Sequence, residues 1–247
     1  MSFRLTSDPS ERIRKVEKIL LMLRLVWRFP RVKGAWPKYE YIKPWLADLA
    51  PVTVVDIGVN HGQFLHLASR LWPGSDILGI EPNAALAEKA NRHYAGNPRV
   101  RIESCAVGAE NGTIDLFVTA NDQNSSIHQP TEAFHDDRTA DGVVRTEPVP
   151  LRRLDGLLDG TEGPMLVKID VQGAELEVLQ GAGERLDDVS AIIIESPFEV
   201  SYDGAAGFDE IYRFLTARGF AYEGALGQLN SKHTGRVRQE DSIYVRR

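Results

Sequence analysis

The stretch PVTVVDIGVNHGQFLHLASRLWPGSDILGIEP, residues 51–82, decides the fold. Residues 52–57 form an apolar run rich in β-branched side chains, which is typical of a buried strand. Glycines then interrupt the pattern, and residues 63–71 place apolar side chains at helical spacing. A second apolar run, residues 76–80, ends at Glu81. The stretch therefore predicts a strand, a glycine-containing turn, a helix and a second strand with a carboxylate at its tip.

The turn after the first predicted strand indicates a nucleoside site. It runs D-I-G-V-N-H-G from Asp56 to Gly62, so its glycines are not spaced as in the G-x-G-x-x-G turn that holds a dinucleotide pyrophosphate. A carboxylate at the start of the turn would repel a phosphate and suits an amino-bearing ligand. Glu81 can accept hydrogen bonds from ribose hydroxyls. The pattern resembles the first two motifs of S-adenosylmethionine (AdoMet) methyltransferases; in the alternative, the glycines serve only the backbone turn.

Length and composition limit the possible classes of protein. A chain of 247 residues, 43% of them hydrophobic, can form one sizeable α/β domain. The net charge of −6 disfavours a nucleic-acid partner. The single cysteine, Cys105, cannot form an internal disulfide. A lone cysteine fits a reducing compartment, and the N-terminus shows no signal-peptide pattern, so we expect a cytoplasmic protein.

The N-terminal segment differs in charge from the rest of the chain. Residues 1–45 carry eleven lysines and arginines against four acidic residues. Apolar positions within residues 10–28 recur at spacings of three and four, which predicts an amphipathic helix with a basic face. Three interpretations stay open: the helix packs on the domain, forms a homodimer contact, or makes a peripheral membrane contact. We therefore expect an N-terminal helical extension, residues 1–49, followed by a domain over residues 50–247.

The rest of the chain alternates predicted strands and helices. Asn83 is expected to cap a helix over residues 84–94. Asn111 and Gly112 give a hairpin signal, and residues 113–119 are expected to pair with 143–149 as an inserted β-hairpin. The other expected elements are a strand over 100–107, a helix over 151–158, a strand from 165, a helix from 174, a strand over 191–196, a helix over 208–218, a strand from 219, a polar loop over 225–240 and a last strand over 242–245.

Two closing strands with no helix after the last one match a particular sheet. The order predicts a seven-stranded class I methyltransferase sheet, a Rossmann-like α/β fold with helices on both faces. A dinucleotide-binding Rossmann domain would end on a parallel sixth strand. An NAD-dependent enzyme is therefore disfavoured both by this ending and by the spacing of the glycines.

A second group of polar side chains lies in MLVKIDVQGAE, residues 165–175. Lys168 and Asp170 alternate along the predicted strand, so both side chains project to the same side. Asp170 and, after the next strand, Glu195 come at carboxyl ends of strands, where open α/β sheets bind ligands. The alternative for Lys168 and Asp170 is a purely structural ion pair.

Seven segments together resemble one family. They are VVDIGVNHGQF, GIEP, NSSI, VKIDVQGAELEVLQGA, IIIE, YDG at 202–204 and QED at 239–241. This set is similar to the FkbM family of AdoMet-dependent methyltransferases, and the similarity covers about residues 50–247. The K-I-D-V-x-G-A-E segment is its most specific part. The N-terminal residues lie outside the resemblance.

The resemblance implies an O-methyltransferase that acts on a hydroxyl of a sugar, a glycolipid or a natural product, with AdoMet as cofactor. It implies that Asp170 positions the acceptor or acts as general base, with Lys168 holding it ionised. His61, Glu195 and Tyr202 are candidates for the acceptor side. The candidate cofactor residues are Asp56, Gly58, Asn60, Gly62, Glu81, Pro82, Ala106, Ser125 and Ser126.

Two further alternatives remain. The chain can be a non-catalytic AdoMet-binding scaffold that uses its basic N-terminal helix to contact a partner or a membrane surface. Asp170, Glu195 and a histidine can also be considered as ligands of a divalent metal ion, although nothing in their spacing demands one.

Overall fold

A computed structural model describes residues 44–131, 142–231 and 234–247. The predicted helix over residues 10–28 lies outside these ranges, and so do its three possible roles: packing on the domain, a homodimer contact and a membrane contact. Within the described ranges, no helix is both long enough and apolar enough to cross a membrane.

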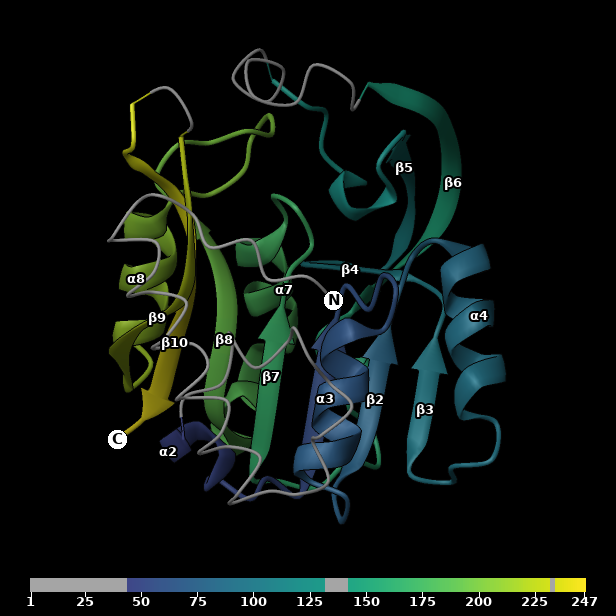
Figure 1. The fold of residues 1–247 in the computed structure, drawn as a ribbon, viewed down its shortest axis with the longest axis vertical. Coiled ribbons are helices and arrows are strands. Elements are labelled where there is room, and N and C mark those ends of the chain that lie inside the picture. Colours follow the sequence, from purple (N-terminus) through teal and green to yellow (C-terminus); the bar gives the residue numbers. More distant parts are fainter. Residues whose placement is uncertain (1–43, 132–141, 232–233) are drawn as a thin grey trace, which may run out of the picture.

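The main sheet has seven strands in the order β3-β2-β1-β7-β8-β10-β9 (Figure 1). The first five strands run parallel, and β10 is antiparallel to both of its neighbours. This order and this single reversal are those of the class I methyltransferase sheet, as predicted. The strands are β1 (Thr53–Ile57), β2 (Asp76–Ile80), β3 (Val100–Glu103), β7 (Met165–Ile169), β8 (Val189–Pro197), β9 (Phe220–Asn230) and β10 (Val237–Arg246).

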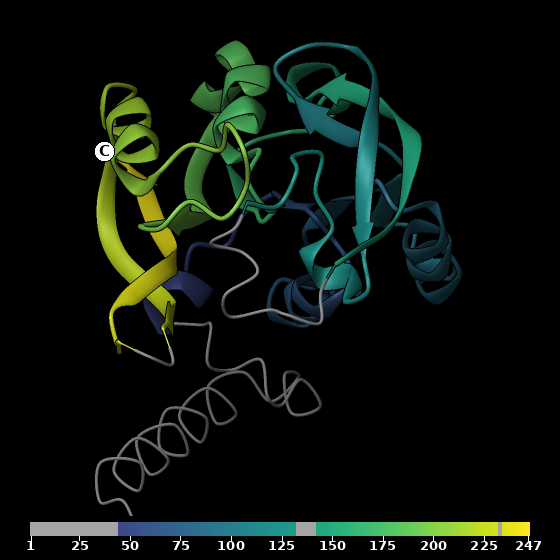
Figure 2. The same cartoon turned by 90° about the horizontal axis from the view of Figure 1, so that it is seen from above.

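Helices cover both faces of the main sheet. They are α2 (Pro44–Ala47), α3 (Gln63–Leu71), α4 (Ala84–Tyr94), α6 (Leu154–Leu157), α7 (Glu175–Ala182) and α8 (Phe208–Thr216), with 3-10 turns η3 (Asp122–Asn124) and η4 (Gly183–Asp188). Figure 2 shows α7 and α8 on one side of the sheet and α2 and α3 on the other. Successive residues of a strand point to opposite faces, so each central strand must be apolar on both.

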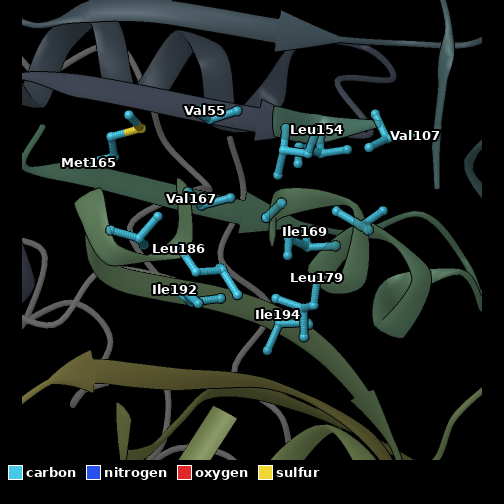
Figure 3. Close-up of a cluster of buried hydrophobic side chains, with 14 of the residues drawn as sticks. Val55, Val107, Leu154, Met165, Val167, Ile169, Leu179, Leu186, Ile192 and Ile194 are labelled. Carbon is cyan, nitrogen blue, oxygen red and sulfur yellow. The ribbon is translucent and has the colours of Figure 1, made fainter. Parts of the chain in front are cut away.

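Two apolar cores result from this arrangement. Val55, Val167 and Ile192, from three adjacent strands, pack with Leu179 of α7 on one face (Figure 3). On the other face, the core includes residues from α2, α3 and β1. Leu46 of α2 is fully buried there. The two cores fix the strand tips that carry the polar side chains.

The predicted helices over 63–71 and 84–94 and the strand over 76–80 are confirmed with the same bounds. Asn83 caps α4 as expected, since its side chain accepts hydrogen bonds from the amides of Ala85 at 3.1 Å and Leu86 at 3.4 Å.

A second, three-stranded sheet has the order β4-β6-β5, from β4 (Ala106–Gly108), β5 (Gly112–Thr119) and β6 (Val143–Arg153). In Figure 1, β5 and β6 lie beyond the carboxyl ends of β2 and β3. The predicted antiparallel pairing of 113–119 with 143–149 is confirmed. Gly181 of α7 joins this small sheet to the main body, because a Cβ atom at Gly181 would lie 2.1 Å from the carbonyl oxygen of Gly108.

Around the small sheet, two predictions are wrong and a third element has different bounds. The strand expected over 100–107 ends at Glu103, and a separate strand begins at Ala106 in the other sheet. Asn111 and Gly112 do not close a hairpin, because β4 and β5 lie on opposite sides of β6. The helix expected over 151–158 is present but shorter: the alternation that buries Val149 and Leu151 continues β6 to Arg153, and α6 covers Leu154–Leu157.

The polar loop expected over 225–240 is also wrong, because β9 and β10 occupy most of it. Two of its polar side chains bind carboxylates of neighbouring strands. The Gln228 amide donates to Glu240 Oε2 at 3.0 Å, and the Gln239 amide donates to Glu195 Oε1.

Candidate active site

The glycine-containing turn is folded against the tips of β2 and β7. Gly58, Asn60 and Gly62 have φ angles of +86°, +48° and +76°. A Cβ atom at Gly58 would lie 1.9 Å from the carbonyl oxygen of Asp170, so only glycine permits this approach of β1 to β7. The backbone amide of Asn60 donates to Glu81 Oε2 at 2.7 Å. The turn therefore connects Glu81, at the tip of β2, directly to Asp170, at the tip of β7.

Glu81 is held rigidly at the tip of β2. The side chain is 6% exposed, and its second oxygen, Oε1, accepts a hydrogen bond from the amide of Asn83 at 2.9 Å. Pro82, between these two residues, is half-buried. Both oxygens of Glu81 therefore accept from backbone amides, one in the glycine-containing turn and one at the start of α4.

Asp56 is a buried carboxylate without a complete hydrogen bond. The residue is 1% exposed, and no donor among the described residues reaches hydrogen-bonding geometry at either oxygen. Burial, above all, raises the pKa of Asp56 to about 7, against the lowering influence of Lys168 and of the Leu65 amide in α3. Buried polar groups are normally satisfied, so an unsatisfied carboxylate beside a ligand-binding turn fits the amino group of a bound molecule.

Lys168 lies between two carboxylates, as the alternation predicted. It is directly opposite Asp56 in the sheet register, with Nζ 3.9 Å from Asp56 Oδ1 and 3.0 Å from Asp170 Oδ2. Burial lowers the pKa of the ammonium, but the Asp170 and Asp56 carboxylates more than offset this, and the pKa is raised. Lys168 is therefore a fixed positive charge at the centre of the site.

Gln172, which the sequence did not single out as a site residue, joins the two carboxylates at the strand tips. Its Nε2 donates to Asp170 Oδ1 at 2.9 Å and to Glu195 Oε2 at 2.8 Å. The hydroxyl of Tyr202 donates to its Oε1 at 2.9 Å. Tyr202 is 5% exposed, so it acts here as a buried partner of Gln172.

The two predicted serines, Ser125 and Ser126, bind different parts of the site. The Ser126 hydroxyl donates to the carbonyl oxygen of Gln172 at 2.6 Å and accepts from the amide of His128 at 2.9 Å. The Ser125 hydroxyl oxygen accepts instead from the amide of Thr119 at 3.3 Å. Ser126 therefore ties its loop to the end of β7, whereas Ser125 ties it to β5.

Two predicted residues lie apart from this cluster. Ala106 is buried among the apolar side chains of the small sheet. His61 is exposed just before α3. Conversely, Asp241 of β10 lies directly opposite Glu195 in the sheet register, although sequence reasoning gave it no role. Burial first, and then Asp170, raise the pKa of Asp241 to about 6. Two signals could have found it: the QED segment at 239–241 and its alternation with Gln239 and Ile243 along β10.

In the described ranges, no three or more histidine, cysteine, aspartate or glutamate side chains are grouped so that they could hold a metal ion.

Fold and site together define a class I methyltransferase. The sheet order is that of this class, and the glycine turn, Glu81 and Asp170 meet at the carboxyl ends of the parallel strands, where such sheets bind ligands. A family model described as the methyltransferase FkbM domain matches residues 56–222. The chain belongs to the FkbM family of AdoMet-dependent methyltransferases.

Curated relatives agree with this assignment. The methyltransferase sdnD of Sordaria araneosa is 25% identical over an alignment of 209 residues. The match covers 67% of this chain and 80% of sdnD. The 2-O-methyltransferase NoeI of Sinorhizobium fredii is 28% identical over 162 residues, 61% of this chain and 65% of NoeI. Both are named as methyltransferases, which gives no support to the scaffold alternative.

Solved structures resemble the chain more distantly. M. capricolum TrmK, in complex with S-adenosyl-homocysteine, is 9% identical with a TM-score of 0.43 and covers 83% of this chain and 69% of its own. WbdD is 17% identical with a TM-score of 0.44, over 84% of this chain and 38% of its own.

Proposed function

We propose that this methyltransferase transfers a methyl group from AdoMet to a hydroxyl of a small-molecule or glycan acceptor, that is, a sugar, glycolipid or natural product. The observation that supports it most is the Lys168–Asp170 pair, a carboxylate held at 3.0 Å from a fixed cation at the tip of β7. The name of NoeI, a 2-O-methyltransferase, points in the same direction. The proposed catalytic domain spans residues 50–247.

The residues of the turn suit the cofactor. We assign Asp56 to the amino group of its methionine portion, because the carboxylate is buried and lacks a complete hydrogen bond. Gly58, Asn60 and Gly62 would let the backbone pass close to the ligand. Glu81 would accept hydrogen bonds from the ribose hydroxyls, because its carboxylate lies at the tip of β2 beside the glycine-containing turn.

The chemistry places two demands on the protein. AdoMet supplies a methyl group on a positively charged sulfur, already a strong electrophile. The site must hold the acceptor oxygen in line with that methyl, which is a problem of orientation. It must also remove the proton of an alcohol, which is a task for a general base. Asp170 would accept the hydroxyl proton as the acceptor oxygen takes the methyl group, and the electron pair of the broken S–CH₃ bond would stay on sulfur.

Lys168 supports this step without a metal ion. Its ammonium holds Asp170 in the ionised form in which a carboxylate can accept a proton. Glu195, joined to Asp170 through Gln172, would complete a polar wall for the acceptor. We expect turnover to be unchanged by a chelator of divalent ions, as measured with and without EDTA.

The cofactor is tested by calorimetric titration with AdoMet, and separately with NAD. We expect AdoMet binding, and a loss of at least about tenfold in affinity for Glu81→Ala, equivalent to about 1.4 kcal/mol. Glu103→Ala is the matched control, because Glu103 is the acid at the tip of the neighbouring strand β3 and pairs with Arg101. A folded protein that binds no AdoMet would refute the proposal.

The acceptor side is tested with radiolabelled AdoMet and a panel of methyl glycosides and natural-product alcohols. For any alcohol that is methylated, Asp170→Ala should lower turnover at least about a hundredfold, because positioned general bases contribute that much or more. Its AdoMet affinity should stay within about threefold of the wild type. If both fall together, Asp170 is a cofactor residue instead.

A further inference from the structure

We propose that Gln172 is a positioning residue that couples two paired segments, residues 124–131 and 201–205, to the carboxylates of Asp170 and Glu195. The inference rests on the proposed function in one respect: these carboxylates are taken to face the acceptor. In this proposal, Gln172 aligns the two carboxylates only while both paired segments are hydrogen-bonded to it.

A single amide group sets the relative position of the two carboxylates. Asp170 and Glu195 come from adjacent strands, and the two hydrogens of Gln172 Nε2 are directed to one oxygen of each, at 2.9 and 2.8 Å. The other oxygen of Asp170 accepts from Lys168, and that of Glu195 accepts from Gln239. All four oxygens therefore face donors, which favours the ionised form of both groups.

The paired segments contact each other through backbone hydrogen bonds. The amide of Thr131 donates to the carbonyl of Ser201 at 2.9 Å, and the amide of Asp203 donates to the carbonyl of Gln129 at 2.8 Å. Between them, Pro130 and Tyr202 form an isolated antiparallel bridge. The two segments are far apart in sequence but form one unit over the strand tips.

This unit is attached to Gln172 at two points. The Ser126 hydroxyl, from the first segment, donates to the Gln172 carbonyl oxygen at 2.6 Å. The Tyr202 hydroxyl, from the second, donates to the side-chain oxygen of Gln172 at 2.9 Å. Because Oε1 accepts from Tyr202, the amide group is oriented with its nitrogen toward the carboxylates. The Tyr202 hydroxyl thus supports the orientation that the two carboxylates require of the amide, and the same hydroxyl lies 3.1 Å from the carbonyl oxygen of Asn124 in the first segment.

The backbone at Gln172 is unusual for a side chain of this size. Its φ angle is +58°, a left-handed conformation that costs energy for any residue other than glycine. The turn is held by the buried carboxylate of Glu175, which accepts from the amides of Val171 at 3.1 Å and Gly173 at 2.9 Å. A glycine would fit the backbone better, so the glutamine is accounted for by what its side chain does.

The coupling has a direct chemical consequence. If the paired segments move away, Gln172 loses the Tyr202 hydroxyl that donates to its amide oxygen, its side chain is no longer held in place, and both carboxylates lose a donor. Each then loses part of the stabilisation of its ionised form, and the two groups are no longer held in a fixed relative position. The site is therefore complete as a base only when the segments that would cover an acceptor are docked.

The test compares Gln172→Met with Tyr202→Phe in the full chain without ligand. Two quantities are measured by nuclear magnetic resonance: the titration of ¹³C-labelled Asp170 and Glu195 carboxyl groups, and the hydrogen exchange of the Thr131 and Asp203 amides. We expect both variants to raise the carboxyl titration midpoints, by about half a pH unit or more in Gln172→Met. We expect exchange of the two amides at least about tenfold faster than in the wild type.

The control is Gln228→Met, which removes a glutamine amide that also donates to a buried carboxylate, that of Glu240, beside Tyr222 and Tyr244. It should leave both quantities unchanged. The inference is overturned if Tyr202→Phe leaves the carboxyl titrations at their wild-type midpoints, or if exchange accelerates equally throughout β1 and β7, which would indicate a general loss of stability. Neither measurement uses AdoMet, so this inference and the proposed function fail independently.

Discussion

Gly58 provides the strictest test of how the site is built. In Gly58→Ala, the new Cβ would start 1.9 Å from the Asp170 carbonyl oxygen, whereas real Cβ atoms stay beyond 3.0 Å. The backbones of β1 and β7 must separate to relieve this contact. We estimate about 1 kcal/mol for the left-handed φ and about 2 kcal/mol for the overpacking. The sum of about 3 kcal/mol predicts a fall in Tm of about 6–12 °C for a chain of this size.

Gly62→Ala is the matched control for this change. Gly62 also has a positive φ, +76°, but nothing lies within 4 Å of a Cβ built there. Only the conformational cost of about 1 kcal/mol remains, which corresponds to about 2–4 °C. Differential scanning calorimetry of both variants separates the two contributions. Equal losses of Tm in the two variants would refute the argument that the close approach of β1 to β7 requires glycine at position 58.

Three further outcomes follow from the charges and hydrogen bonds of the site. Because burial raises the pKa of Asp56 from 3.8 to about 7, wild-type stability should fall relative to Asp56→Asn as the pH rises from 4 to 7. Thermal unfolding at both pH values measures this; a constant difference in Tm would contradict it. Lys168→Met should cost about 2–3 kcal/mol in urea unfolding, less than for a fully buried pair because Asp170 is 35% exposed. Unchanged stability would show that the ion pair contributes nothing. Glu175→Ala should cost about 2 kcal/mol, because two buried amides lose their acceptor, whereas Glu175→Gln keeps one oxygen and should lose about half as much. Equal effects of the two substitutions would rule out this capping role.

Elements with local signals were predictable from the sequence. The helix over 63–71 follows a glycine turn, and the helix over 84–94 follows the Asn83 cap, so the residues that start each helix are its immediate neighbours. Likewise, Lys168 and Asp170 meet because neighbouring residues of one face lie two positions apart.

Elements that depend on distant partners were not predictable in the same way. The run over 100–107 is continuous in sequence, but pairing decides to which sheet each part belongs. Ala106 pairs with Leu151 of β6 and not with β2. Gln172 binds Glu195 and Tyr202, which lie 23 and 30 positions further along the chain. No periodicity within a short window records such contacts.

The contact between Gly181 and Gly108 has consequences for any attempt to redesign this enzyme. Helix α7 begins three residues after Gln172 and has eight residues, so its far end lies only about 12 Å from that turn. A larger residue at position 181 would push the helix off the small sheet, and the helix would carry the Gln172 turn with it. Libraries that aim to change the acceptor should therefore keep glycine at position 181, since a substitution there would alter the catalytic geometry without touching any ligand.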